Sequence, residues 1–437
     1  MKLNIRNFAK INEADIVIDG ITVIAGENNT GKSTVGKILF SLFNALSDID
    51  RKIFEERIKE IEVTNTDIML NHISVLDLPR SVATRTVLNN VREINIQLRK
   101  QIDENLFVLD GNILDIITKA IINGEIVTKS SEKHDWSEMI DDVYKNTKEV
   151  FYLPEEMIVK EFISRYFNHV FHSQIQSLSN KEGQGAGIIL DIKGKKQRIF
   201  FEKNYCKEFK GEINIINKAV YIDNPFIIDE LSKYNDLNPM NQMLKNLLSE
   251  HYKDGILDGV IETVRAKEKL GNIFETLQNV VDGEIIIDQN EEFYLKCDGY
   301  NEPISFHNLS TGMKSFVILK MLLEKGCLKN KDVIILDEPE IHLHPQWQIA
   351  YAELIVLLQK HFDLSVVVTT HSPYFVDAIN LFSCKYGTDE KVNYYLSSNN
   401  GNGVIMECVT NKIDLIYKKM ASPIQMLDTL RYELNNH

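Results

Sequence analysis

The chain has 437 residues, and its 63 acidic against 49 basic side chains give it a formal net charge of −14. This charge excludes a protein that coats nucleic acid by bulk positive charge, so any such contact must come from a local patch or a partner. No apolar run reaches the roughly 18 residues of a membrane helix, and five cysteines without a CxxC pair argue against a disulfide framework or zinc finger and favour the reducing cytoplasm.

The first elements in chain order are short strands, which we expect at 2–6, 13–18 and 21–25 from their alternating or β-branched apolar residues. A helix is predicted over 32–46. From about 50 to 180 the apolar residues recur at helical spacing among many charges, which is typical of a set of antiparallel helices.

The second half of the chain returns to strands. Two apolar runs in 187–201 flank a basic turn and predict a hairpin, and 219–222 reads as a strand. Residues 226–280 are expected to be mostly helical, and strands are expected again at 284–288 and 293–297. The order then becomes helix, strand, helix, strand, helix, which argues for a parallel sheet with covering helices, over 312–326, 332–337, 345–361, 364–370 and 373–380.

A glycine-rich loop follows the third predicted strand. Residues 26–33 match G-x-x-x-x-G-K-[ST], and the loop stands between a buried type of strand and a helix, where a phosphate loop belongs. Backbone N–H groups of such a loop surround phosphate oxygens. The predicted nucleotide contacts are Gly26, Asn28, Asn29, Thr30, Gly31, Lys32, Ser33 and Thr34. Lys32 would reach the β/γ-phosphates, and the Ser33 hydroxyl would bind Mg²⁺.

Two adjacent carboxylates end the apolar strand 333–337. We expect Asp337 to hold Mg²⁺, directly or through water, and Glu338 to orient and deprotonate the attacking water. Acids at strand ends are often merely solvated. The phosphate loop elsewhere in the chain favours the functional interpretation.

Two further motifs frame this acidic pair. Ser310 can cap the helix that follows it, and Gly312 has a bare backbone that permits close approach of a ligand. The simpler alternative is that this motif only begins a helix. His371 stands at the end of a later apolar strand, where its imidazole could bind a γ-phosphate oxygen.

The four motifs in this order resemble the ATP-binding-cassette ATPases of the SMC, RecF and OLD group. In that family's terms they are Walker A (26–33), the signature (309–314), Walker B (333–338) and the switch histidine (His371). The runs 337–346 and 370–374 are similar to those of OLD-type and PtuA-like anti-phage ATPases, and so is the opening of the chain. The resemblance covers about 1–45 and 284–380.

The resemblance implies an α/β fold, a P-loop NTPase head of the ABC type with a mixed sheet, N-terminal antiparallel strands and a large, mainly helical insertion. It implies Mg²⁺-dependent hydrolysis of ATP, with Lys32, Glu338 and His371 as catalytic residues and Ser33 and Asp337 as metal ligands. Two heads in this family enclose two ATP molecules. The signature residues Ser310, Thr311, Gly312 and Lys314 would then face the nucleotide of a second copy, in a dimer or higher even oligomer.

The motifs also suggest a division of the chain. We predict an N-terminal head lobe (1–48), a helical insertion (49–182), a β-hairpin region returning to the head (183–225), a helical segment (226–282), a C-terminal head lobe (283–385) and C-terminal strands and a helix (386–437). The family's Q-loop glutamine cannot be assigned, and Gln97 and Gln101 are candidates by residue type only.

OLD nucleases carry a C-terminal Toprim domain with separated acidic residues. The 372–437 segment is too short for it and has no D-x-D pair, so we expect no intrinsic Toprim nuclease. The favoured interpretation is a sensor or regulator of an anti-phage system whose nuclease, of HNH or Toprim type, is a separate protein. The alternatives are a RecF/SMC-like repair ATPase that binds DNA directly, and a scaffold that binds ATP with negligible hydrolysis.

Three smaller clusters have simpler interpretations. His342 and His344, and likewise His169 and His172, could bind metal, but interface or structural roles are favoured. A solvated hairpin tip is favoured over a phosphate-backbone contact for the basic cluster of Lys193, Lys195, Lys196 and Arg198.

Overall fold

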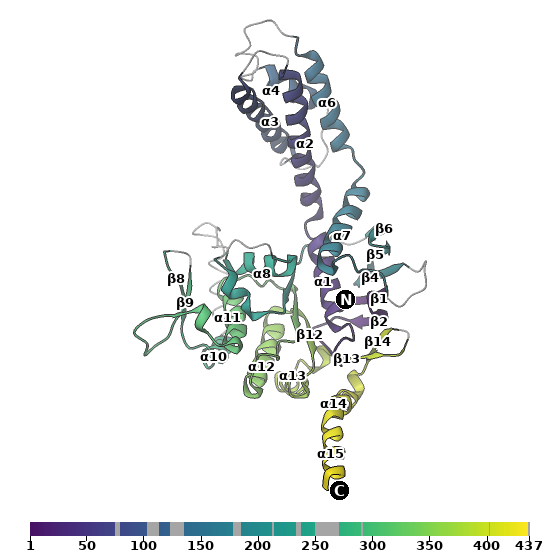
Figure 1. The fold of residues 1–437 in the computed structure, drawn as a ribbon, viewed down its shortest axis with the longest axis vertical. Coiled ribbons are helices and arrows are strands. Elements are labelled where there is room, and N and C mark those ends of the chain that lie inside the picture. Colours follow the sequence, from purple (N-terminus) through teal and green to yellow (C-terminus); the bar gives the residue numbers. More distant parts are fainter. Residues whose placement is uncertain are drawn as a thin grey trace. The chain divides into compact units, whose positions relative to one another are not determined.

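The computed structural model describes residues 1–74, 79–102, 113–122, 135–177, 185–211, 214–232, 237–249, 271–289, 292–401 and 403–435. The chain divides into two compact units. The head unit combines 1–47 with 160–437, and the helical unit is 48–159. Both are drawn in Figure 1. Among the described residues, every helix is too short or too polar to span a lipid bilayer.

One mixed sheet of eleven strands organises the described part of the head unit, in the order β6-β5-β4-β1-β2-β14-β13-β3-β12-β11-β7. Its strands are β1 (Lys2–Phe8), β2 (Ile11–Val17), β3 (Ile21–Gly26), β4 (Ala186–Ile192), β5 (Lys195–Glu202), β6 (Tyr205–Gly211), β7 (Ala219–Ile222), β11 (Val333–Asp337), β12 (Ser365–Thr370), β13 (Val392–Asn399) and β14 (Val404–Cys408). The end that contains β1, β2, β4, β5 and β6 is antiparallel, as predicted for the N-terminal strands.

The other half of the sheet is parallel. Strand β3 pairs in parallel with β12 and β13, and β11 pairs in parallel with β12 and β7. All six residues of β3 are buried, which fits a strand covered on both faces. Since the carboxyl ends of parallel strands meet at one edge, the loops after β3, β7, β11 and β12 are brought together there.

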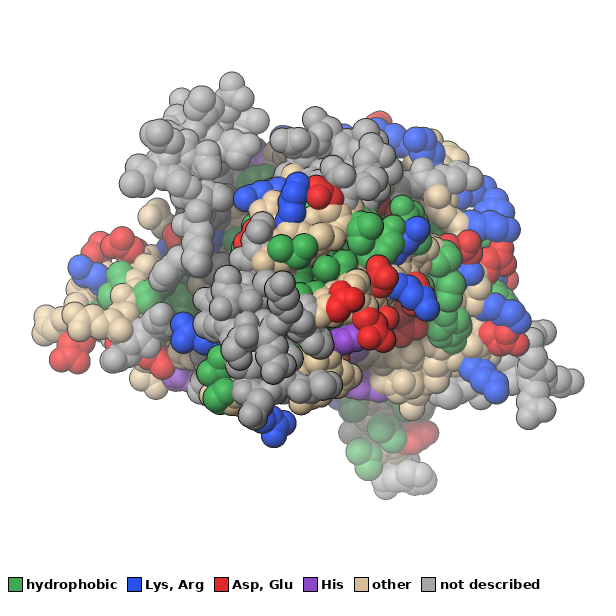
Figure 2. Space-filling view, turned by 90° about the horizontal axis from the view of Figure 1, so that it is seen from above, with side chains coloured by type: hydrophobic (Ala, Val, Ile, Leu, Met, Phe, Trp, Pro, Cys, Tyr) green, Lys and Arg blue, Asp and Glu red, His purple; other side chains and the backbone are tan. Residues whose placement is uncertain are grey.

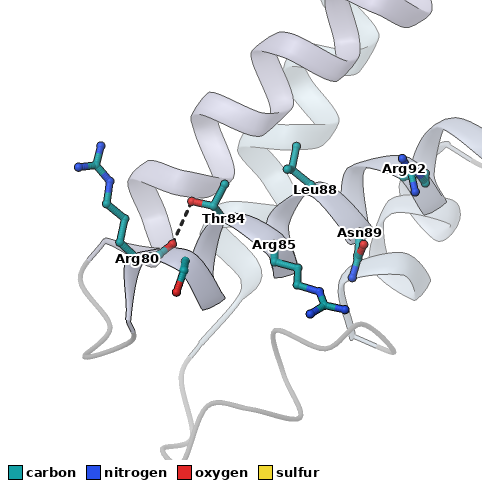
Figure 3. Close-up of a pocket in the computed structure, with 7 residues that line it drawn as sticks. Arg80, Thr84, Arg85, Leu88, Asn89 and Arg92 are labelled. Carbon is teal, nitrogen blue, oxygen red and sulfur yellow. Dashed lines mark hydrogen bonds between the residues drawn. The ribbon is translucent and has the colours of Figure 1, made fainter.

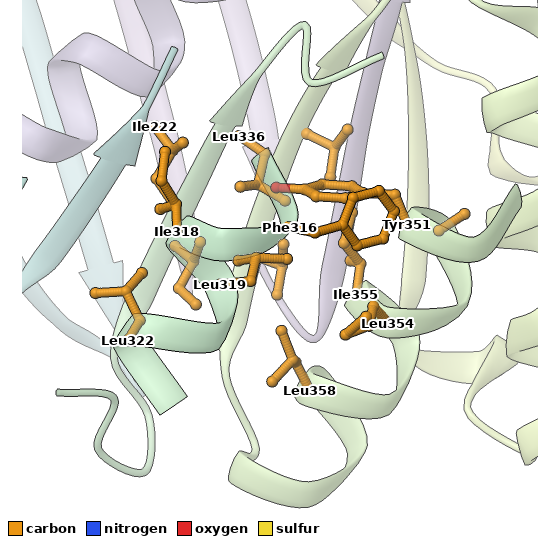
Figure 4. Close-up of a cluster of buried hydrophobic side chains, with 14 of the residues drawn as sticks. Ile222, Phe316, Ile318, Leu319, Leu322, Leu336, Tyr351, Leu354, Ile355 and Leu358 are labelled. Carbon is orange, nitrogen blue, oxygen red and sulfur yellow. The ribbon is translucent and has the colours of Figure 1, made fainter. Parts of the chain in front are cut away.

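Most of the head unit's helices pack beside this sheet, whereas the C-terminal helix extends away from it (Figure 1). The head unit's helices are α1 (Lys32–Leu46), α7 (Glu155–Phe171, shared with the helical unit's end), α8 (Pro239–Ser249), α10 (Gly271–Gln278), α11 (Thr311–Glu324), α12 (Pro345–Phe362), α13 (Pro373–Tyr386), α14 (Asp414–Met420) and α15 (Ser422–Asn435). Phe316 of α11 and Tyr351 of α12 pack edge to face, with ring centroids 5.1 Å apart. Figure 4 shows both rings beside Leu336 of β11 in the main core.

A small separate sheet holds β8 (Glu284–Ile287), β9 (Phe293–Lys296) and β10 (Ile304–Ser305), all antiparallel. The strands predicted at 284–288 and 293–297 are therefore confirmed. The stretch predicted to be mostly helical over 226–280 contains the 3₁₀ helix η1 (Pro225–Glu230), α8 and α10, and its part at 250–270 lies outside the described residues.

The helical unit consists, in its described part, of α2 (Ile49–Ile73), α3 (Arg80–Ile102), α4 (Ile113–Ile122) and α6 (Ser137–Phe151). Their apolar faces meet in one core that includes Ile61, Val91 and Val143, as the helical spacing of apolar residues predicted. A buried polar pair lies within the unit, where the Asn65 amide donates to the Thr147 hydroxyl over 3.0 Å.

The fold class predicted from the sequence, an α/β head with a mixed sheet and a mainly helical insertion, is confirmed. Strand β6 was not predicted. The sequence also did not indicate that β13 and β14 lie between β2 and β3, which follow each other in the chain.

Candidate nucleotide site

The phosphate loop links the end of β3 to the start of α1. Its backbone enters the left-handed region at Asn29 (φ 66°) and Gly31 (φ 71°). No side chain caps α1, and its first turn holds no acidic residue. The N–H groups at this helix start are therefore suited to bind an anion, as the glycine-rich motif predicted.

Gly26 is required by the neighbouring strand. A Cβ atom built on it would lie 2.3 Å from the Ser397 hydroxyl oxygen of β13, so no larger residue fits without movement. The Thr30 hydroxyl is hydrogen-bonded to the same Ser397 and donates to the Glu27 carbonyl over 2.7 Å. Strand β13 therefore helps to shape the loop.

Lys32 is the cation at the centre of the site. Its side chain is 3% exposed, and its ammonium donates to the Glu27 carbonyl over 2.9 Å and lies 3.7 Å from a Glu338 oxygen. Burial lowers the pKa of Lys32, while the carboxylates of Glu338, Asp337 and Glu340 oppose that shift. In this structure the ammonium is bound by the protein's own groups.

Asp337, at the end of β11, is oriented by two hydroxyl groups. Tyr221 of β7 donates to one carboxylate oxygen over 2.5 Å, and Thr369 of β12 donates to the other over 2.5 Å. Burial, and next the charge of Asp337, raise the pKa of Tyr221 well above its usual value, so this phenol remains a donor. The carboxylate is thus held in place by both neighbouring strands.

Glu338 and His371 form the other end of the cluster. Glu338 has a left-handed backbone (φ 52°), stabilised because its N–H donates to the Thr369 carbonyl over 3.1 Å. His371 Nε2 lies 2.8 Å from a Glu338 oxygen and 2.7 Å from the Lys32 ammonium. Nε2 can either accept from Lys32 or donate to Glu338, so the tautomer of the ring decides which of the two contacts is a hydrogen bond.

Glu340 lies beneath this cluster as a buried carboxylate. One of its oxygens accepts from the Thr370 hydroxyl over 2.6 Å and from the His371 backbone N–H over 2.7 Å. Its other oxygen is buried and has no hydrogen-bond partner among the described residues. Burial raises the pKa of Glu340 above its usual value. We infer that Glu340 fixes the peptide that carries His371.

Substitution Glu340→Gln is expected to change how stability depends on pH. The folded state binds the Glu340 proton more tightly than the unfolded state, so this group's contribution to stability grows as pH falls through its raised pKa toward the usual glutamate pKa of 4.5. Urea unfolding of both proteins across that range should show the wild type gaining stability relative to the variant at the acidic end. An unfolding free-energy difference that is constant with pH would contradict this assignment.

The predicted signature residues begin α11. The exposed Ser310 accepts from the Met313 N–H over 3.3 Å and thus caps the helix, and Thr311 is partly exposed behind it. Gly312 is buried, and a Cβ atom on it would lie 2.9 Å from the Trp347 ring. The absence of a side chain at Gly312 therefore serves close packing of Trp347 in this structure.

Lys314 has partners within the same chain. Its ammonium lies 2.6 Å from an Asp229 carboxylate oxygen and 5.2 Å from the centre of the Phe226 ring, and its side chain is 3% exposed. Among the described residues, no hydrogen bond joins the signature residues Ser310, Thr311, Gly312 and Lys314 to the Lys32 cluster. Their predicted contact with a second copy's nucleotide stays a prediction.

The smaller predicted clusters are placed as follows. His344 caps α12 by accepting from the Gln346 N–H over 3.4 Å, and the His342 ring lies edge to face with Phe226. His169 and His172 are exposed. Within the described part of the chain, no group of three or more His, Cys, Asp and Glu side chains could hold a metal ion.

The two Q-loop candidates lie on α3 in the helical unit. The Gln97 amide donates to Glu93 over 2.7 Å, and the side chain of Gln101 lies outside the described residues. The basic cluster of 193–198 forms the β4–β5 turn and the start of β5, as the predicted hairpin required.

Sequence reasoning missed Tyr221, Thr369 and Glu340. The signals were present: Tyr221 is the polar member of a buried strand, Thr369 is the penultimate residue of a strand, and Glu340 lies two residues after Glu338. The sequence alone did not reveal that strand β11 lies between β7 and β12 in the sheet.

The fit to Mg²⁺ rests on oxygen donors. Asp337 offers a fixed carboxylate, and the Ser33 hydroxyl at the start of α1 makes no hydrogen bond to any described residue. Mg²⁺ is commonly held by one or two protein oxygens together with phosphate oxygens and water. Ser33 and Asp337 suit that mode of binding.

Comparisons with known proteins agree with this geometry. The chain is 28% identical over 191 residues to Septu protein PtuA of Bacillus thuringiensis, covering 40% of this chain and 46% of that protein. It is 28% identical over 187 residues to the Retron Ec83 probable ATPase of Escherichia coli, covering 36% of this chain and 34% of that protein. The chain thus spans less than half the length of these relatives. The predicted resemblance to PtuA-like proteins is confirmed.

Among solved structures, an Smc head bound to the C-winged helix domain of ScpA matches 93% of this chain and 97% of its own, at 12% identity and a TM-score of 0.45. That score is too low to support an argument. The model of the AAA ATPase domain matches residues 1–376, which include the phosphate loop, the acidic strand end and His371. The chain therefore belongs to the AAA ATPase domain family.

Proposed function

We propose that this chain binds and hydrolyses ATP with Mg²⁺ as the sensor or regulatory subunit of an anti-phage defence complex. The observation that carries the ATPase part is the convergence of Lys32, Asp337, Glu338 and His371 at one edge of the parallel sheet. The defence part is supported by the two curated relatives, which are named as a Septu protein and a retron ATPase.

Each residue's role follows from its contacts. The start of α1 and the Lys32 ammonium would bind the phosphates, and Lys32 must leave Glu338 and His371 to do so. Ser33 and Asp337 would hold Mg²⁺, which neutralises charge on the phosphates. Freed from Lys32, the Glu338 carboxylate can orient a water molecule and accept its proton.

His371 would then donate a hydrogen bond to the γ-phosphate. Its backbone N–H is bound by Glu340, so the ring's position relative to Glu338 is set by the buried turn after β11. Once Lys32 has moved, Nε2 can donate to a phosphate oxygen instead of to Glu338. The triphosphate thus replaces protein groups as the partner of both Lys32 and His371.

The same proposal includes a dimer of two heads. Ser310 lies exposed at the start of α11, where a hydroxyl and a helix N-terminus suit a phosphate of a second copy's nucleotide. ATP would then join two copies, and hydrolysis would release them. We propose that this cycle controls a separately encoded nuclease of HNH or Toprim type, and that the chain has no nuclease site of its own.

Substitution Ser310→Asn tests the dimer. Asparagine caps a helix about as well as serine, so the fold should be retained, whereas the bulkier amide replaces the hydroxyl offered to the phosphate. Each of the two copies would lose one hydrogen bond to a charged group, about 1.5–3 kcal/mol apiece. The dimer would therefore lose about 3–6 kcal/mol, and dimerisation should require at least about 100-fold more protein.

The measurement is light scattering of the Glu338→Gln protein with ADP and with Mg-ATP, with and without Ser310→Asn. The proposal expects the Glu338→Gln protein to form a dimer with Mg-ATP but not with ADP. It expects the protein that also carries Ser310→Asn to remain a monomer at the same concentration. A mass that is independent of nucleotide in both proteins would refute the dimer while leaving ATP binding to be judged separately by titration.

A further inference from the structure

Helix α3 differs in charge from the rest of the chain. It carries five basic side chains, Arg80, Arg85, Arg92, Arg99 and Lys100, against the single acid Glu93, in a protein whose formal net charge is −14. Figure 2 shows acidic, basic and hydrophobic side chains interspersed on the face that is seen from above Figure 1. A strongly acidic chain does not need this basic helix for solubility.

The arginines of α3 follow its helical repeat. Arg85, Arg92 and Arg99 are seven residues apart, so they lie along one face of the helix. Arg99 is engaged, because its guanidinium forms two hydrogen bonds of 2.7 Å to the Glu55 carboxylate. Arg85 and Arg92 are exposed, and no hydrogen bond or ion pair is seen between them and the described residues.

These two arginines border a shallow hollow of about 640 Å³ (Figure 3). We call its lining the arginine face, and it consists of Arg80, Ser81, Thr84, Arg85, Leu88, Asn89 and Arg92. Leu88, which is 47% exposed, is the only apolar side chain among the described residues of this lining. The opposite side of α3 packs in the unit's core through Val87, Val91 and Ile94, so packing does not account for the arginines.

We propose that the arginine face binds the sugar–phosphate backbone of a nucleic acid. Guanidinium groups pair with phosphate in a bidentate manner, and hydroxyl and amide side chains such as Ser81 and Asn89 are common phosphate partners. Arg85 and Arg92 are about 10.5 Å apart along the helix axis. That spacing is close to the major groove of duplex DNA, about 12 Å wide, which phosphates flank on both sides.

An acidic protein is the other partner that this charge could attract. Protein interfaces have an apolar centre rich in aromatic residues, whereas the described residues of the arginine face include one leucine and no aromatic side chain. The same lack of aromatic rings argues against base stacking. The arginine face therefore fits backbone binding without recognition of base sequence.

The test measures binding of the full-length chain, without ATP, to a short labelled DNA duplex by fluorescence anisotropy. The variant Arg85→Gln/Arg92→Gln removes two phosphate contacts and should lower the slope of log affinity against log salt by about 1.8. Between about 50 and 200 mM salt, the wild type should therefore lose about twelvefold more affinity than the variant. Duplexes of different sequence should bind equally.

Lys145→Gln/Lys148→Gln is the matched control, since it removes two exposed positive charges from α6 in the same unit. The control variant should leave the slope of log affinity against log salt unchanged. The variant Arg85→Lys/Arg92→Lys, which keeps both positive charges, should largely retain the wild-type slope. The proposal is overturned if the control variant weakens binding as much, or if the wild type does not bind the duplex at about 50 mM salt. It is also overturned if polyglutamate of equal charge competes as well as unlabelled duplex, because the face would then favour acidic protein.

Discussion

Replacing Glu338 by glutamine is expected to slow ATP hydrolysis about 100- to 10,000-fold, the usual contribution of a general base. Glutamine keeps the size of the side chain, and the hydrogen bond from the residue-338 N–H to the Thr369 carbonyl does not involve the carboxylate. The strained turn at φ 52° should therefore remain. What is lost is the group that accepts the proton of the attacking water.

Phosphate release by the purified protein at saturating Mg-ATP measures this effect, with ATP binding followed by titration. Glu390→Gln is the matched control, because Glu390 is exposed on a distant turn after α13 and should have no effect on turnover. Turnover by the Glu338→Gln protein at the wild-type rate would remove Glu338 from the reaction. Equal low activity of both wild type and variant would instead favour the ATP-binding scaffold.

Replacing Lys32 by methionine is expected to weaken ATP binding about 10- to 100-fold. Hydrogen bonds to charged groups contribute about 1.5–3 kcal/mol, which corresponds to that range. Methionine is also unbranched and fills a similar volume, so the nearly fully buried position should stay packed. The loss is then of the cation that would pair with the phosphates.

Titration with a fluorescent ATP analogue measures the affinity, and Lys37→Met, on the same helix α1 but only partly buried, is the matched control. The Lys37 variant should bind nearly as well as the wild type. If the Lys32 and Lys37 variants bind ATP equally, the ammonium of Lys32 does not contact the nucleotide in the way that its position predicts.

The local structure around the phosphate loop and Asp337 was predicted correctly, because residues close together in the sequence determine it. The phosphate loop joins a strand to a helix over 26–33, and Asp337 ends a strand of four apolar residues, so a short window contains the whole signal. The roles of Tyr221 and Thr369 depend on which strands are neighbours. Pairing of β7 with β11 joins segments more than 100 residues apart, and no local pattern encodes it.

The signature motif shows the same limit. Ser310 could be predicted as a helix cap from its position alone, and the structure confirms it. The partners of Lys314 and Gly312 could not, because Asp229 is 85 residues away in the chain and Trp347 belongs to another helix. A side chain that could bind a ligand according to its motif can equally well bind or pack against another residue of the same chain.

The sheet order has a consequence for how the protein is made. Strands β2 and β3 are separated by only three residues, yet β14 and β13, from 392–408, lie between them. The Val17 backbone N–H donates to the Tyr395 hydroxyl oxygen, 378 positions further along the chain. During synthesis the ribosome must therefore produce nearly the whole polypeptide before the strand that carries the phosphate loop gains its second neighbour. Such long-range closure slows folding, and a nascent chain that has not reached residue 408 leaves two strand edges open to wrong pairing.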